Sequence, residues 1–207
     1  MSQTIKVSRQ DIIWGYFAQF FSIASGIIIL PMVLRMLSAE EVGMNYLMLS
    51  VGQLVTLVDF GFSPQFGRNV TYVYSGAQRL LKNGIETLDS SVKVEINYSL
   101  LAALIQTARW IYRLMGGVVL LLMLTAGTGY VYQVTAGFSN LPNSLLIWLI
   151  YSAGVFFQIY YSYYSALLTG SGKIKESKKA MVYSNVLKIV LTYVLLYAGY
   201  GLLGVVI

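Results

Sequence analysis

The chain has 207 residues, of which 57% are hydrophobic and only 11% are charged. A soluble domain carries roughly a quarter charged residues, so this chain has too little charge to cover a surface that faces water. This composition excludes a soluble enzyme, a disordered chain and a secreted disulfide scaffold. The absence of cysteine and histidine also excludes a thiol nucleophile, a Ser-His-Asp triad and a histidine-bearing zinc site. We therefore expect neither an enzyme nor a cofactor.

Apolar segments long enough to cross a membrane, which takes roughly 20 residues, recur along the chain. There are five, at 12–34, 42–60, 111–130, 144–169 and 181–199, and a sixth begins at 202 and is cut off at 207. The first is too long for the apolar core of a cleavable signal peptide, so we expect it to remain as an anchor. We predict an all-α, polytopic transmembrane bundle with five complete membrane-spanning helices and the start of a sixth.

The positive residues indicate how these helices are oriented. The N-terminal tail and the second and fourth loops together hold 12 of the 14 Lys and Arg residues. Because positively charged loops stay in the cytoplasm, this alternation predicts a cytoplasmic N-terminus. It also explains the net charge of +6 without a nucleic-acid partner.

Several local signals predict where helices begin and end. Ser38 and Glu41 have the spacing of a capping box that opens the second helix. Pro64, with Gly61 and Gly67, should break this helix at its cytoplasmic end.

The second loop, 62–109, has apolar residues at helical spacing, and we predict a cytoplasmic helical hairpin there. Its first arm would contain Leu81, Ile85, Leu88 and Val92. Its second arm, 100–108, would run directly into the third membrane-spanning helix. Aromatic residues near segment ends are typical of an interfacial belt, and they are Trp14, Tyr16, Trp110, Tyr130, Tyr132 and Trp148.

Polar residues in four of the five segments share one side of the helix at 100° per residue. The segment 111–130 has no comparable stripe. Two explanations remain open: close helix packing through small and hydroxyl side chains, or a shared polar cavity. We favour the cavity, since 144–169 is polar along its whole length. The stripes are Gly15, Gln19, Ser22 and Gly26; Asn45, Gly52, Thr56 and Asp59; Tyr151, Gly154, Gln158, Ser162, Ser165 and Thr169; and Ser184, Asn185, Lys188 and Thr192.

Charged residues within or beside the segments are candidate functional groups, because charge inside a bilayer is costly. Lys188 lies ~10 Å along the helix from Met181. It either extends toward the cytoplasmic face or faces the cavity and attracts an anionic group such as a phosphate. Asp59 either forms an interfacial contact, for instance an ion pair with Arg68, or takes part in gating. The predicted substrate path comprises Lys188, Asn185, Gln158, Gln19, Thr56, Asp59 and Arg68.

Four short runs carry a resemblance to a known family. The run LPMVLRMLSAEEVG at 30–43 resembles the loop between the first two helices of bacterial O-antigen-unit flippases. The run LVDFGFSPQFGR at 57–68 is similar to the end of their second helix. The runs NYSLL at 97–101 and TARWIYR at 107–113 resemble the start of their third helix. These flippases belong to the multidrug/oligosaccharidyl-lipid/polysaccharide exporter superfamily.

The resemblance implies a transporter of two six-helix lobes, of which residues 1–207 correspond to the N-terminal lobe. It implies translocation of an undecaprenyl-diphosphate-linked oligosaccharide, such as an O-antigen repeat unit, across the bacterial inner (cytoplasmic) membrane by alternating access. The implied partners are this lipid-linked oligosaccharide, membrane lipids, and polysaccharide polymerase and chain-length proteins. Lys188 matches the cation expected to meet the diphosphate.

Three alternatives to a flippase lobe stay open. A cation-coupled multidrug exporter of the same superfamily would need a buried acidic residue, and no Asp or Glu lies in the middle of a segment. A membrane-embedded lipid-sugar transferase would need an acidic metal site. Glu86, Asp89 and Glu95 are the only acidic cluster in a loop, and their spacing does not suggest such a site. The third alternative is an inactive fragment.

Overall fold

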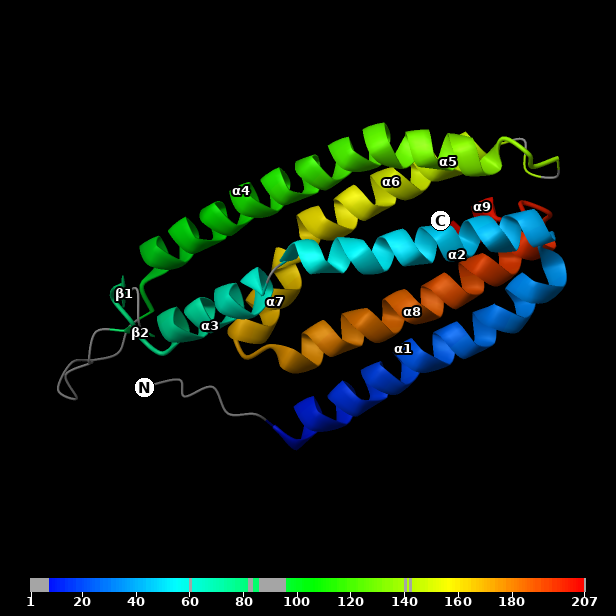
Figure 1. The fold of residues 1–207 in the computed structure, drawn as a ribbon. Coiled ribbons are helices and arrows are strands. Elements are labelled where there is room, and N and C mark those ends of the chain that lie inside the picture. Colours follow the sequence, from blue (N-terminus) through cyan, green and yellow to red (C-terminus); the bar gives the residue numbers. More distant parts are fainter. Residues whose placement is uncertain are drawn as a thin grey trace.

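A computed structural model of the chain shows a bundle of long helices (Figure 1). The structure describes residues 8–59, 61–81, 84–85, 96–139, 141 and 143–206. Its helices are α1 (Arg9–Met36), α2 (Ala39–Thr56), α3 (Phe62–Tyr74), α4 (Tyr98–Leu122), α5 (Thr128–Thr135), α6 (Ser144–Tyr161), α7 (Tyr163–Gly170), α8 (Ile174–Tyr197) and α9 (Leu203–Val206). A 3₁₀ turn, η1 (Leu57–Asp59), extends α2, and a π-helical turn, η2 (Met123–Gly127), joins α4 to α5.

The prediction of an all-helical membrane protein is confirmed at this level. Five helical stretches in the described chain are long and apolar enough to cross a membrane: Arg9–Met36, Ala39–Asp59, Tyr98–Thr135, Ser144–Gly170 and Ile174–Tyr197. Each contains most or all of one predicted segment. Within the predicted start of a sixth segment, Leu203–Val206 form the short helix α9.

Helix ends follow the local chemistry read from the sequence. The Ser38–Glu41 capping box is confirmed: the Ser38 N–H donates to Glu41 Oε2 at 2.9 Å, and the Glu41 N–H donates to Ser38 Oγ at 3.3 Å. The second helix does break at Gly61, whose φ of 77° favours glycine. Pro64 then lies in the first turn of α3, where its missing N–H costs little, and Gly67 lies within α3.

The predicted helical hairpin is only partly right. The stretch predicted as its second arm is helical, because α4 starts at Tyr98 and continues through η2 to the end of α5. Its first arm is wrong where the structure describes it: Leu81 and Ile85 lie in two short antiparallel strands, β1 (Leu80–Leu81) and β2 (Gly84–Ile85). Gly84 pairs with Leu81 in this hairpin, and because glycine is a poor residue for a helix interior, it disfavours the helix that the apolar spacing predicts. Leu88, Val92, Glu86, Asp89 and Glu95 lie outside the described residues.

The helices pack as three pairs, which Figure 1 shows side by side: α1 with α8, α4 with α6, and α3 with α7. Helix α2 lies against α6. One apolar core joins Met44 and Met48 of α2 to Val119 of α4 and Trp148 of α6. A second core forms where α3, α4 and α7 meet, around Tyr112. We use "basic end" for the end of the bundle that holds the starts of α1, α4 and α8 and the end of α3 (Figure 1).

Trp148 corrects the prediction of an aromatic belt. Its side chain is fully buried in the first core rather than placed at an interface. Its Nε1 donates to the Met123 carbonyl and to Thr128 Oγ1, both at 3.2 Å, so the π-helical turn supplies its polar partners. A Cβ at Gly127 would lie 2.7 Å from Trp148 Cζ2, so the ring fits only against glycine. Trp110, Tyr130 and Tyr132 remain exposed.

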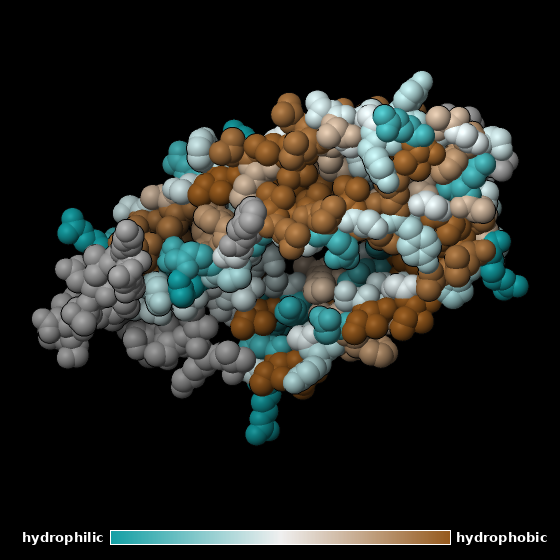
Figure 2. Space-filling model, in the orientation of Figure 1, coloured by the Kyte–Doolittle hydropathy of each residue, from teal (hydrophilic) through white to brown (hydrophobic). Residues whose placement is uncertain are grey.

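The outer surface of the bundle is apolar. Large hydrophobic side chains stay exposed along most helices, including Ile13, Phe20, Leu54, Leu121 and Leu187. Figure 2 shows apolar residues over most of one face, with hydrophilic residues gathered in the hollow between α2 and α8. Exposed apolar surface on this scale is typical of lipid contact, so the chain is a polytopic membrane protein.

Candidate substrate cleft

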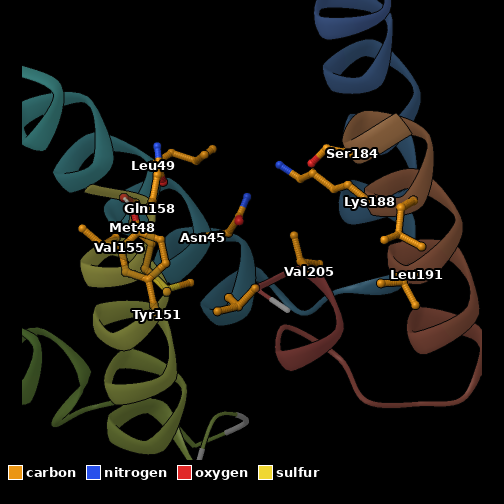
Figure 3. A pocket seen from close by; sticks show the side chains of 13 residues that line it. Asn45, Met48, Leu49, Tyr151, Val155, Gln158, Ser184, Lys188, Leu191 and Val205 are labelled. Atoms are coloured by element: carbon orange, nitrogen blue, oxygen red, sulfur yellow. Dashed lines mark hydrogen bonds between the residues drawn. The ribbon is translucent and has the colours of Figure 1, made fainter. Parts of the chain in front are cut away.

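A cleft of about 410 Å³ lies between the α2–α6 side of the bundle and α8, with α9 beside it. Figure 3 shows its walls from close by. The lining residues are Asn45, Met48 and Leu49 of α2; Tyr151, Gly154, Val155 and Gln158 of α6; Ser184, Leu187, Lys188 and Leu191 of α8; and Val205 and Val206 of α9.

Polar side chains from three helices face this cleft. Lys188 and Ser184 extend from α8 toward Asn45 of α2, and Gln158 of α6 lies beyond Asn45 (Figure 3). Among the described residues, none of these four side chains forms a hydrogen bond with another residue, and Lys188 meets no carboxylate in the lining. Their donors are therefore available to an occupant of the cleft.

The α2–α6 wall is fixed by a direct hydrogen bond between helices. The Tyr151 hydroxyl donates to the Met48 carbonyl at 2.6 Å. Gly52 makes this approach possible, because a Cβ at that position would lie 2.6 Å from the Tyr151 hydroxyl oxygen. Tyr151 and Gly52 therefore serve helix packing, the explanation that competed with the cavity, and they hold one side of the cleft in place.

The α8 wall is fixed at both of its ends. At the basic end, Asp11 accepts the Lys175 N–H at 3.0 Å through Oδ1 and the Ser8 N–H at 2.7 Å through Oδ2. At the opposite end, Glu41 Oε1 accepts the Leu202 N–H at 2.8 Å, just beyond α8. Helix α8 is thus held near both ends, while its middle, with Lys188, borders the cleft.

The structure brings together two of the residues predicted for the substrate path, Lys188 and Gln158. Asn185 is half-buried and donates to the Met181 carbonyl at 3.0 Å, outside the cleft lining. Thr56 is exposed and donates to the Gln53 carbonyl at 2.7 Å. Gln19 is exposed on α1, which packs along α8 and contributes nothing to the lining. The prediction that the first helix lines this cavity is therefore wrong.

Asp59 and Arg68 lie away from the cleft. Asp59 accepts the Tyr112 hydroxyl at 3.0 Å and the Ser63 N–H at 3.3 Å, so it caps α3 and ties it to α4. Arg68 donates to Gln65 rather than to Asp59. It borders a second pocket, of about 310 Å³, between α3 and α7.

Sequence reasoning placed Asn45 and Ser184 in polar stripes but did not select them for the site. Asn45 shares its stripe with Thr56, and Ser184 shares its stripe with Lys188, so membership of the stripe could have identified both. The apolar lining residues Met48 and Val205 could not be identified in this way, because the spacing of apolar residues does not distinguish a helix face that lines a cleft from one that contacts lipid.

The chemistry of the cleft suits an anion. A lysine ammonium surrounded by amide and hydroxyl groups attracts anions, and charge-assisted hydrogen bonds to phosphate oxygens are strong. Among the described residues, no acidic cluster is placed to hold a metal ion. The chain matches no protein-family model, no curated protein and no solved structure.

Proposed function

We propose that this chain is one lobe of a transporter that moves an undecaprenyl-diphosphate-linked oligosaccharide across the bacterial inner membrane. The observation that carries the proposal is Lys188, a cation in the middle of a membrane-length helix that faces a polar cleft. A lysine at the centre of a bilayer costs about 2.5–3.5 kcal/mol if it meets only lipid. A cleft that admits water and an anion removes most of that cost.

The groups around Lys188 suit a diphosphate. Its ammonium offers three N–H donors, and the amides of Asn45 and Gln158 and the Ser184 hydroxyl offer more from the other walls. Leu187 and Leu191 are exposed on α8 at the same cleft, where they can contact an isoprenoid tail. The volume is in the range of small-molecule sites, so we expect the cleft to hold the diphosphate and its nearest sugar rather than the whole glycan.

The same geometry argues against the alternative of a multidrug exporter. A cation-coupled exporter needs an acidic residue inside the membrane, and the lining of the cleft contains Lys188 and no carboxylate.

A binding measurement tests the proposal directly. The purified chain should bind undecaprenyl diphosphate more tightly than undecaprenol, which has the same tail without the anion. Lys188→Ala should remove this preference, and Lys188→Arg should keep part of it. Lys179→Ala is a matched control, because Lys179 lies on the same helix over the Trp14 ring. Equal binding of the two lipids by the unmodified chain would refute the proposal.

Transport can be tested in cells that lack their own flippase. The complete transporter gene that includes this lobe should restore export of surface glycan, and Lys188→Ala should abolish the restored export at equal membrane levels. Full export by the Ala variant would rule out a role of Lys188 in the substrate path.

A further inference from the structure

A groove of about 360 Å³ runs along the outer face of α4, on a different side from the cleft. Its lining residues are Trp110, Arg113, Leu114, Gly117, Val118 and Leu121. Gly117 leaves the groove open, because a Cβ at that position would meet no atom within 4 Å. The neighbouring Gly116 points the opposite way and packs against Phe156 of α6. The groove therefore belongs to the exposed surface of the bundle.

Positive charge is concentrated at one end of this groove. The Arg113 guanidinium lies over the Tyr160 ring, 5.8 Å from its centroid. Arg109, one turn closer to the basic end, also interacts with the Tyr160 side chain. Tyr160 positions both guanidinium groups without offsetting their charge, and the groove lining contains no carboxylate. Each arginine keeps N–H donors for a further anion.

The rest of the groove is apolar. Leu114, Val118 and Leu121 are about half exposed, and they border the space above Gly117. The helix rises about 12 Å from Arg113 to Leu121. The groove therefore has its charged residues at one end and extends into the membrane along apolar residues. Trp110 lies beside Arg113, as is typical of the boundary between headgroups and hydrocarbon.

We infer that this groove binds an anionic phospholipid. Its phosphate lies at Arg109 and Arg113, and an acyl chain covers Gly117. Arginine forms paired hydrogen bonds to phosphate oxygens, and basic sites at the membrane surface select anionic headgroups. A zwitterionic phospholipid would bring its own cation close to two guanidinium groups, which lowers its affinity. The inference does not depend on the proposed function, because no residue of α4 lines the cleft.

Fluorescence quenching of Trp110 tests this site. The purified chain is reconstituted in phosphatidylcholine vesicles that contain brominated phosphatidylglycerol, or brominated phosphatidylcholine at the same mole fraction. The signal of Trp110 is obtained by subtracting that of a Trp110→Phe variant, since Trp14 and Trp148 also fluoresce. Brominated phosphatidylglycerol should quench Trp110 more strongly than brominated phosphatidylcholine.

Variants separate the headgroup from the acyl chain. Arg113→Gln should lower the preference for phosphatidylglycerol about fivefold, and Arg109→Gln together with Arg113→Gln should remove it. Both arginines are exposed, so these changes leave the packing intact. Arg35→Gln, at the far end of α1, is the charge control and should have no effect.

Filling the groove tests the acyl chain. Gly117→Leu should reduce quenching by both brominated lipids, whereas Gly129→Leu should not; Gly129 lies in α5 and also has open space around its Cβ position. Lys188→Ala should leave all of these signals unchanged. Equal quenching by the two lipids in the unmodified chain, or a preference that survives the double arginine variant, would overturn the inference.

Discussion

The two sides of α6 meet their neighbours in opposite ways. Toward α4 and α5, Trp148 is buried, its N–H is bonded, and Phe156 packs on Gly116. Toward α8, Gly154 and Gln158 border a cleft and stay exposed. Glycine therefore has a different role on each side. Gly116 and Gly127 allow an aromatic ring to pack closely against the backbone, whereas Gly154 leaves space in the cleft. Four substitutions test where the bundle is closed and where it is open, from the largest expected effect to the smallest.

Trp148→Ala should cost the most stability. Removing a fully buried tryptophan creates a cavity and leaves its hydrogen-bond acceptors without that donor, which corresponds to about 3–5 kcal/mol. Thermal unfolding of the purified protein in detergent measures the loss. Leu149→Ala, at the adjacent and half-exposed position, should cost far less. Similar losses for the two variants would show that the α4–α6 contact is not a tight core.

Gly170→Ala should cost about 1–3 kcal/mol through overpacking. A Cβ at Gly170 would lie 2.4 Å from the Gly67 carbonyl oxygen, so α3 and α7 would have to move apart. The matched control is Gly154→Ala, because a Cβ at this cleft position meets no atom within 4 Å. Unfolding midpoints of the two variants should differ clearly, and equal midpoints would contradict the contrast between closed and open glycine positions.

Tyr112→Phe should destabilise the protein by about 1 kcal/mol. The change removes the hydroxyl that donates to Asp59 at 3.0 Å, while Asp59 keeps the Ser63 N–H. Tyr132→Phe alters an exposed side chain and serves as the reference. If Asp59 were mainly paired elsewhere, the unfolding free energies of the two variants would coincide.

Gln158→Leu should change stability by less than about 0.5 kcal/mol, because its side chain is exposed in the cleft. Ser152→Leu, at a fully buried position of the same helix, should cost at least about 1 kcal/mol. This pair also separates the two explanations of the polar stripes. A large loss for Gln158→Leu would indicate that the stripe serves helix packing rather than a cavity.

Sequence alone identified the long helices and the Ser38–Glu41 capping box, since both depend on residues close together in the chain. It did not identify which stripe faces the cleft. Gln19 and Gln158 occupy equivalent positions in periodic patterns, and only the pairing of α1 with α8 leaves Gln19 outside. Trp148 was misplaced for a similar reason: its position near a segment end says nothing about the π-helical turn that receives it.

Glu41 has a consequence for any movement of the bundle. One oxygen of its carboxylate accepts the Ser38 N–H at the start of α2, and the other accepts the Leu202 N–H just beyond α8. Gly201 brings this backbone close, because a side chain there would collide with the carboxylate. A displacement of α8 from α2 that preserves both bonds must pivot around this carboxylate, so the distance between the two helices would grow with every turn away from it.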